Sequence, residues 1–240
     1  MKDKHVFFNP LRIISPKLDS EAARLEDLHQ QPVSETFTLE EGLIISLSKI
    51  IEMIRLIREA YAATCDQKDL IGWDKLALEV DQQQQLLLTN LTCSTTIPAR
   101  ECKAFILFPD HLGRVGNYLE RIGNCWQIKC ADDLNFSDMA NEEIEQTFKL
   151  MMDMMINFRD TLIAPNRFLL EHVVAQSKHL DEICQDWQLA HVERLLNGTC
   201  APRASSVYLD VLESAQSLSR HVKDMAEKML GFVELSQKEN

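Results

Sequence analysis

Apolar residues recur at alternating intervals of four and three along most of the chain, and this spacing constrains the fold more than any other feature. The clearest run extends from Leu43 to Tyr61. Such a seam places apolar side chains on one stripe of an α-helix, which a neighbouring helix must cover. Six segments carry a stripe of this kind, at 38–65, 70–92, 100–130, 138–163, 165–196 and 202–232. The sequence therefore predicts six long helices packed in antiparallel bundles.

Residues that begin helices support these ranges. Thr38 followed by Glu41 matches a capping box, and Ser137 is placed to cap the fourth helix. Pro165 stands where the first turn of the fifth helix is expected, a position that tolerates proline because an N–H there has no helical partner. Pro109 either kinks the third helix or marks its true start.

The composition agrees with a helical fold. Only seven glycines and seven prolines occur in 240 residues, so few turns interrupt the elements. Leu, Ile, Met, Glu and Gln together outnumber Val, Thr, Tyr and Trp, which favours helices over strands. We predict an all-α fold of two tandem antiparallel three-helix bundles with an N-terminal arm. The arm covers 1–37, with a short helix expected at 20–29, and the bundles cover 38–131 and 132–236.

The charge balance limits the partners. The formal net charge is −12. Nucleic acids and anionic membranes bind basic surfaces, so neither is an expected partner. No signal-peptide pattern stands at the N-terminus. No apolar run approaches the roughly 18 residues that span a bilayer. We therefore expect a cytoplasmic protein that is peripheral to a membrane at most.

Cysteines and sequence motifs give no sign of catalysis. The seven cysteines are odd in number, irregularly spaced and without a CxxC pair. This usage predicts reduced cytosolic thiols, most of them buried as small apolar side chains. The histidines show no zinc-site spacing, and no P-loop, GxGxxG or GxSxG motif occurs. We predict that the protein is not an enzyme.

The third predicted helix has a face with almost no side chains. Gly113, Gly116 and Gly123 lie three and seven residues apart, with Asn117 and Glu120 beside them. Each glycine inside a helix costs about 1 kcal/mol relative to alanine, so an interaction should offset the cost. Close approach of another helix is one explanation. Docking of an ion or a partner on this interaction face is a second, and a break in the helix is a third.

Two stretches resemble one protein family. The sequence LERIGN at 119–124 resembles the LERIGD signature of the PhoU family of phosphate-uptake regulators, whose domain also forms the cytoplasmic tail of bacterial sodium/phosphate cotransporters. The stretch from His191 to Glu213 resembles the end of that domain in the cotransporters. The resemblance implies two antiparallel three-helix bundles and a regulatory role in phosphate uptake without catalysis.

The same resemblance implies a metal motif that this chain only partly keeps. A weak internal repeat with an offset of 93 residues aligns Glu213 with Glu120. Family members carry an E/D-x-x-x-D motif on the third helix of each bundle, which binds iron or zinc in some of them. Here the second acids are replaced by the neutral residues Asn124 and Ser217, and Asp210 lies one turn before Glu213. These five residues are the candidate metal ligands, in a degenerate motif.

The sequence thus predicts a PhoU-like regulator that acts by protein–protein contact. Its expected partner is a phosphate transporter component or a sensor kinase. Formation of a homo-oligomer, such as a dimer, is a further possibility that the sequence leaves open. One alternative is a carboxylate-bridged metal-binding helical protein. Another is a helical adaptor unrelated to phosphate.

Overall fold

The computed structural model describes residues 38–238 except 64, 66–69, 71 and 94–103, and it describes no side chain at 92, 93 or 234–238. The predicted arm at 1–37, its short helix at 20–29 and the start of the third predicted helix at 100–103 lie outside the described residues. Six long helices occupy the described part, which contains no strand. They are α3 (Leu39–Ala62), α4 (Trp73–Cys93), α6 (Phe108–Ala131), α7 (Asp138–Ile163), α8 (Arg167–Leu196) and α9 (Pro202–Lys238).

Side chains that cap the first backbone amides determine where three of these helices begin. The Thr38 hydroxyl accepts a hydrogen bond from the amide of Glu41, whose carboxylate accepts one in return, so the predicted capping box is confirmed. Ser137 caps α7 as predicted. The expected start of the fifth helix at Pro165 is wrong. The side chain of Asn166 accepts hydrogen bonds from the first two amides beyond Arg167, and this cap starts α8 after the proline.

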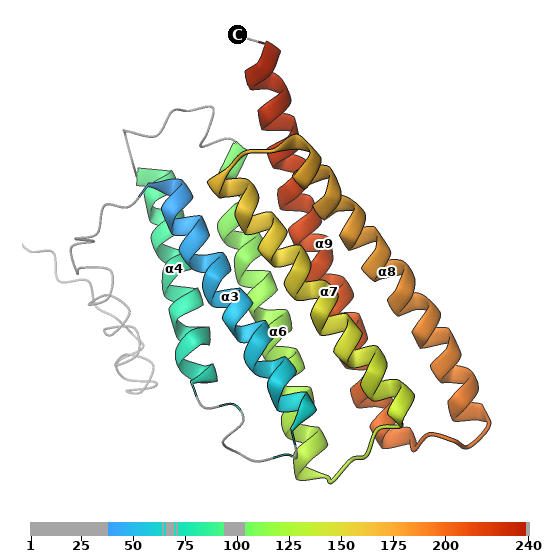
Figure 1. Ribbon diagram of the computed structural model, residues 1–240. Helices are drawn as coiled ribbons and strands as arrows, with labels where there is room; N and C mark the ends of the chain where they lie inside the picture. The colour runs from blue at the N-terminus through green and yellow to red at the C-terminus, as the bar shows by residue number, and fades with distance from the viewer. Residues whose placement is uncertain (1–37, 64, 66–69, 71, 94–103, 239–240) are drawn as a thin grey trace, which may run out of the picture. The chain divides into compact units, whose positions relative to one another are not determined.

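The described residues from Thr38 onward form one compact unit, and its helices group in two sets of three. In the first set α3, α4 and α6 pack on one another, and in the second set α7, α8 and α9 do the same. Consecutive helices alternate in direction, which Figure 1 shows from α3 to α9. This is the predicted all-α architecture of two antiparallel three-helix bundles. The two sets meet where α6 packs on α9 and α3 packs on α7. The placement of a domain boundary between 131 and 132 stays a prediction.

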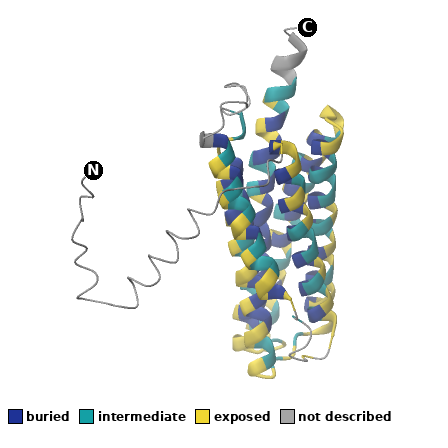
Figure 2. Cartoon of the chain, turned by 90° about the vertical axis from the view of Figure 1, so that its left-hand side faces the viewer, coloured by how far each residue is buried: buried dark blue, intermediate teal, exposed yellow. Residues whose placement is uncertain are grey.

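The apolar seams form the core. Buried residues lie where the helices face one another, and exposed residues lie on their outer sides (Figure 2). All five seam residues between Leu43 and Ile57 are almost completely buried. Met151, Met154 and Met155 of α7 are buried as well, so the methionine-rich segment fills the core rather than forming a surface. In the described part, no helix is both long enough and apolar enough to cross a membrane.

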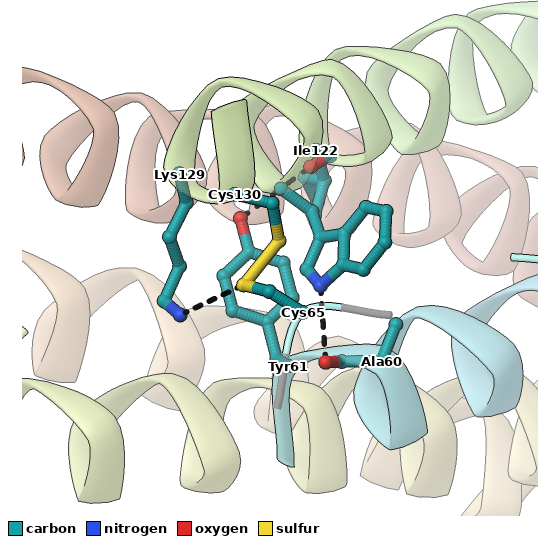
Figure 3. Close-up of a disulfide and its surroundings, with 7 residues drawn as sticks. Ala60, Tyr61, Cys65, Ile122, Lys129 and Cys130 are labelled. Carbon is teal, nitrogen blue, oxygen red and sulfur yellow. Dashed lines mark hydrogen bonds between the residues drawn. A yellow bond between two sulfur atoms is a disulfide. The ribbon is translucent and has the colours of Figure 1, made fainter. Parts of the chain in front are cut away.

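A disulfide joins Cys65, just after α3, to Cys130 near the end of α6, with their Cα atoms 5.3 Å apart (Figure 3). The prediction of reduced thiols is therefore wrong for this pair. The helix ends are brought together by Trp126, whose indole N–H donates to the carbonyl of Ala60 at 3.0 Å. Lys129 lies beside the bond, with its Nζ 3.7 Å from the Cys65 sulfur.

Two other described cysteines behave as predicted. Cys125 and Cys184 are free and buried. Burial raises the pKa of the Cys125 thiol to about 11 and that of the Cys184 thiol to about 12. Both thiols therefore stay protonated at neutral pH, which suits packing rather than reactivity.

We expect reduction of the Cys65–Cys130 disulfide to lower the free energy of unfolding. The bond closes a loop with a sequence separation of 65 residues. Loop-closure entropy for that length amounts to about 4 kcal/mol. Urea unfolding of the oxidised protein and of the Cys130→Ser variant measures the difference. Cys200→Ser, which removes a free thiol, is the control and should leave stability unchanged. Equal stability of the oxidised and reduced wild-type protein would contradict the expectation.

Candidate functional site

The glycine face of α6 packs against α4. A Cβ atom built on Gly123 would lie 3.1 Å from the ring of Trp73, closer than most real contacts. A Cβ atom on Gly113 would lie 2.4 Å from the side-chain oxygen of Gln84. Both glycines are buried. Close approach of a second helix from the same chain therefore accounts for these glycines.

The third glycine is less tightly enclosed. A Cβ atom on Gly116 would meet only a methyl group of Val80, at an ordinary 3.5 Å. The predicted interaction face at Gly113, Gly116, Asn117 and Gly123 is thus largely occupied by α4, and Asn117 is its exposed member. A partner that bound here would have to contact the edge of the face rather than the glycines.

A different side of α6 binds α9 through an ion pair. Arg121 donates from Nη2 to Asp210 at 2.7 Å, and the same nitrogen lies 3.5 Å from a carboxylate oxygen of Glu213. The hydrogen bond to Asp210 raises the pKa of the Arg121 guanidinium. Arg121 belongs to the LERIGN stretch and both acids belong to the second stretch that resembles the PhoU family. The two stretches therefore meet at the contact of α6 with α9.

Glu120 lies in other surroundings, although it is adjacent to Arg121 in the sequence. Partial burial raises the pKa of its carboxyl, and the charges of Asp81 and Asp74 on α4 raise it further. Asn124, one turn later, is exposed. The structure thus places Glu120 near acids of α4, whereas Asp210 and Glu213 lie near Arg121.

The candidate metal ligands are therefore not gathered into one cluster. Among described residues, none of the five belongs to a group of three histidine, cysteine or acidic side chains close enough to share an ion. Ser217 is half-buried, one turn beyond Glu213. The guanidinium of Arg121 pairs with Asp210 and lies near Glu213, so a cation there would have to compete with it. Metal binding by this set stays a prediction.

A buried polar cluster in the second bundle was not predicted. Arg194 of α8 donates two hydrogen bonds to Glu143 of α7, at 2.9 and 2.8 Å. The hydroxyl of Tyr208 on α9 donates to the same carboxylate, and the ring of His191 stacks on Tyr208 with centroids 4.4 Å apart. Burial and then the charge of Arg194 lower the pKa of His191.

Three residues of this cluster belong to the stretch from His191 to Glu213 that resembles the PhoU family. His191 and Arg194 lie one turn apart, so both face the core of the bundle, and Tyr208 reaches them from α9. The spacing of His191 and Arg194 was a usable signal in the sequence. Glu143 was not recognisable, because it lies 51 residues from Arg194.

Comparison with solved structures identifies the class of fold. PhoU from Pseudomonas aeruginosa superposes with a TM-score of 0.71 and 13% identity, covering 89% of this chain and 98% of that one. The phosphate transport system regulatory protein PhoU from Streptococcus pneumoniae gives a TM-score of 0.70 and 12% identity, covering 80% and 91%. No family model and no curated protein sequence matches the chain. The chain has a PhoU-like fold.

Glycine substitutions test the packing of α4 on α6. We expect Gly116→Ala to stabilise the protein by about 1 kcal/mol, because alanine is the better helix former and its methyl group has room. Gly123→Leu should destabilise it by about 1–3 kcal/mol, because the side chain would displace Trp73. Urea unfolding measures both. The same effect at both positions would show that α4 does not approach α6 as described.

A double-mutant cycle tests the ion pair between the bundles. We expect a coupling energy of about 0.2–1 kcal/mol between Arg121→Gln and Asp210→Asn, since the pair is partly exposed. The coupling should fall in 1 M NaCl because salt screens exposed charges. Arg55→Gln, which breaks contacts within α3 alone, is the control and should show no coupling to Asp210→Asn. Zero coupling at low salt would contradict the bridge.

Proposed function

We propose that this chain is a regulator of phosphate transport that acts in the cytoplasm by protein–protein contact and without catalysis. The observation that carries the proposal is the likeness to two PhoU proteins over at least 91% of each of them. The meeting of both resembling stretches at the contact of α6 with α9 adds support. The proposed partner is a phosphate transporter component or a sensor kinase.

The surface that we assign to this partner is an apolar stripe on α8. Leu189, Val192 and Leu196 are spaced three and four residues apart and are 69%, 46% and 80% exposed. The main contacts of α8 are with α7 and α9, so these side chains point away from its packing partners. A contiguous exposed apolar stripe on a helix is typical of a contact with another protein.

The carboxylate-bridged metalloprotein is the weaker candidate. Two of its five candidate ligands, Asp210 and Glu213, face the positive charge of Arg121. Iron or zinc at Glu120, Asn124, Asp210, Glu213 and Ser217 stays a prediction that elemental analysis of the purified protein tests. The third candidate is a helical adaptor unrelated to phosphate. The identity of the bound partners distinguishes it from the proposed regulator.

Affinity capture tests the proposed regulator. The full chain is expressed with an affinity tag in the organism that encodes it and is purified from cells grown in high and in low phosphate. The co-purifying proteins are identified by mass spectrometry. We expect a phosphate transporter component or a sensor kinase, in amounts that change with phosphate. Replacing all three residues of the α8 stripe by Gln should reduce its recovery at least about tenfold, which corresponds to 1.4 kcal/mol.

The control changes exposed apolar residues on other helices. Leu78→Gln on α4 and Met139→Gln on α7 remove similar apolar surface and should leave recovery unchanged. Capture of partners with no role in phosphate uptake would favour the unrelated adaptor. Full recovery of the transporter or kinase by the stripe variant would support the proposed partner but would contradict the assignment of its binding surface to α8.

A further inference from the structure

Three potential metal ligands from two helices converge at the contact of α6 with α9. They are His111 of α6 and His221 and Asp224 of α9, and one ligand atom from each lies within 4.8 Å of the other two. The Nδ1 atoms of the two histidines are 3.1 Å apart. Among described residues no other group of three histidine, cysteine or acidic side chains is as close.

Neighbouring residues of α6 and α9 fix the positions of these three side chains. His221 and Asp224 are three residues apart on α9 and therefore lie on the same face. The ring of Tyr118, two turns after His111 on α6, stacks on His221 with a centroid distance of 5.8 Å and an interplanar angle of 24°. All three ligand side chains are half-buried. The cluster is therefore accessible to an ion but is oriented by its neighbours.

The distance between the imidazoles fits a shared cation. Zinc bonds to imidazole nitrogen at about 2.0–2.1 Å in tetrahedral geometry, which separates two such nitrogens by roughly 3.3 Å. The observed 3.1 Å is close to that value. Two facing Nδ1 atoms can share either a proton, in a hydrogen bond, or a metal ion. In the metal-bound form the carboxylate of Asp224 supplies the third ligand.

Burial of His221 favours the neutral imidazole that a metal needs. Burial lowers the pKa of His221, and the nearby His111 and Arg114 lower it further, while Asp224 and Asp110 oppose the shift. Arg114 is itself paired with Asp110 at 2.9 Å, so its charge is largely balanced.

We propose that His111, His221 and Asp224 bind a divalent transition metal ion of the zinc type. Two imidazoles and one carboxylate leave a fourth coordination position open to water or to an outside ligand. The site is separate from the degenerate carboxylate set, since His111 and Arg121 are ten residues, or about 15 Å, apart along α6. A bound ion would link the two bundles. The proposal does not rest on the proposed function.

Metal titration of the full chain tests the site. The protein is stripped with a chelator, dialysed without reductant so that the Cys65–Cys130 disulfide persists, and titrated with Zn²⁺ by calorimetry and with Co²⁺ by visible absorption. We expect one equivalent to bind. Loss of an outer-shell partner weakens metal binding about 10–100-fold, so loss of a direct ligand in His111→Ala or His221→Ala should cost at least about 100-fold. Asp224→Asn should bind more weakly than wild type.

Control variants test whether any loss of metal affinity is specific to the proposed ligands. His172→Ala and His179→Ala remove exposed histidines of α8 and should leave affinity unchanged. Far-UV circular dichroism verifies that each metal-free variant is folded, and His111→Asn and His221→Asn replace any that is not. Absence of saturable one-equivalent binding would overturn the proposal. So would unchanged affinity in the double variant His111→Ala/His221→Ala, or a thiolate-to-cobalt absorption band, which would place the ion on cysteine.

Discussion

The structure depends on α6, which packs on helices of both bundles. It packs on α3 and α4 within its own bundle and on α9 across the contact between bundles. Each side has its own chemistry. The apolar stripe with Trp126 faces the interior near α3, the glycines face α4, and charged or polar side chains face α9. Helices pack 8–10 Å apart according to the size of the side chains between them, so a helix enclosed in this way needs small residues on one side.

The charged contacts differ in what they contribute. Arg121–Asp210 and Arg58–Glu145 join the two bundles, and in both pairs the side chains are substantially exposed. Exposed pairs of this kind are worth less than about 1 kcal/mol, so they contribute little to holding the bundles together. Arg194–Glu143 is different, because both side chains are largely buried and Tyr208 adds a third bond. Breaking such a pair from one side costs about 3–5 kcal/mol.

Local features of the fold could be predicted from the sequence, and distant pairs could not. Capping at Thr38 and Ser137, the buried seams and the packing role of the methionines all depend on residues within a few turns of one another. The disulfide, the Arg121–Asp210 pair and the His111–His221 pair join residues 65, 89 and 110 positions apart. Their formation depends on how whole helices pack, which periodicity does not specify. The histidine pair is brought together by the packing of α6 on α9 and follows no motif spacing in the sequence.

The predicted internal repeat pairs several residues of the contact between the bundles with residues of different chemistry. An offset of 93 residues relates Asp210 to Asn117, and the same offset relates Arg121 to Ser214. The counterpart of the charged pair is thus two neutral residues, so the ion pair is present once. The offset likewise relates His221 and Asp224 to Ile128 and Ala131, and His111 to Ala204. None of these three counterparts has a side chain with a metal-ligand atom. Glu120 and Glu213 also differ, since one faces acids of α4 and the other faces Arg121. The Arg121–Asp210 ion pair and the proposed His111–His221–Asp224 metal site therefore each occur once, at the contact of α6 with α9.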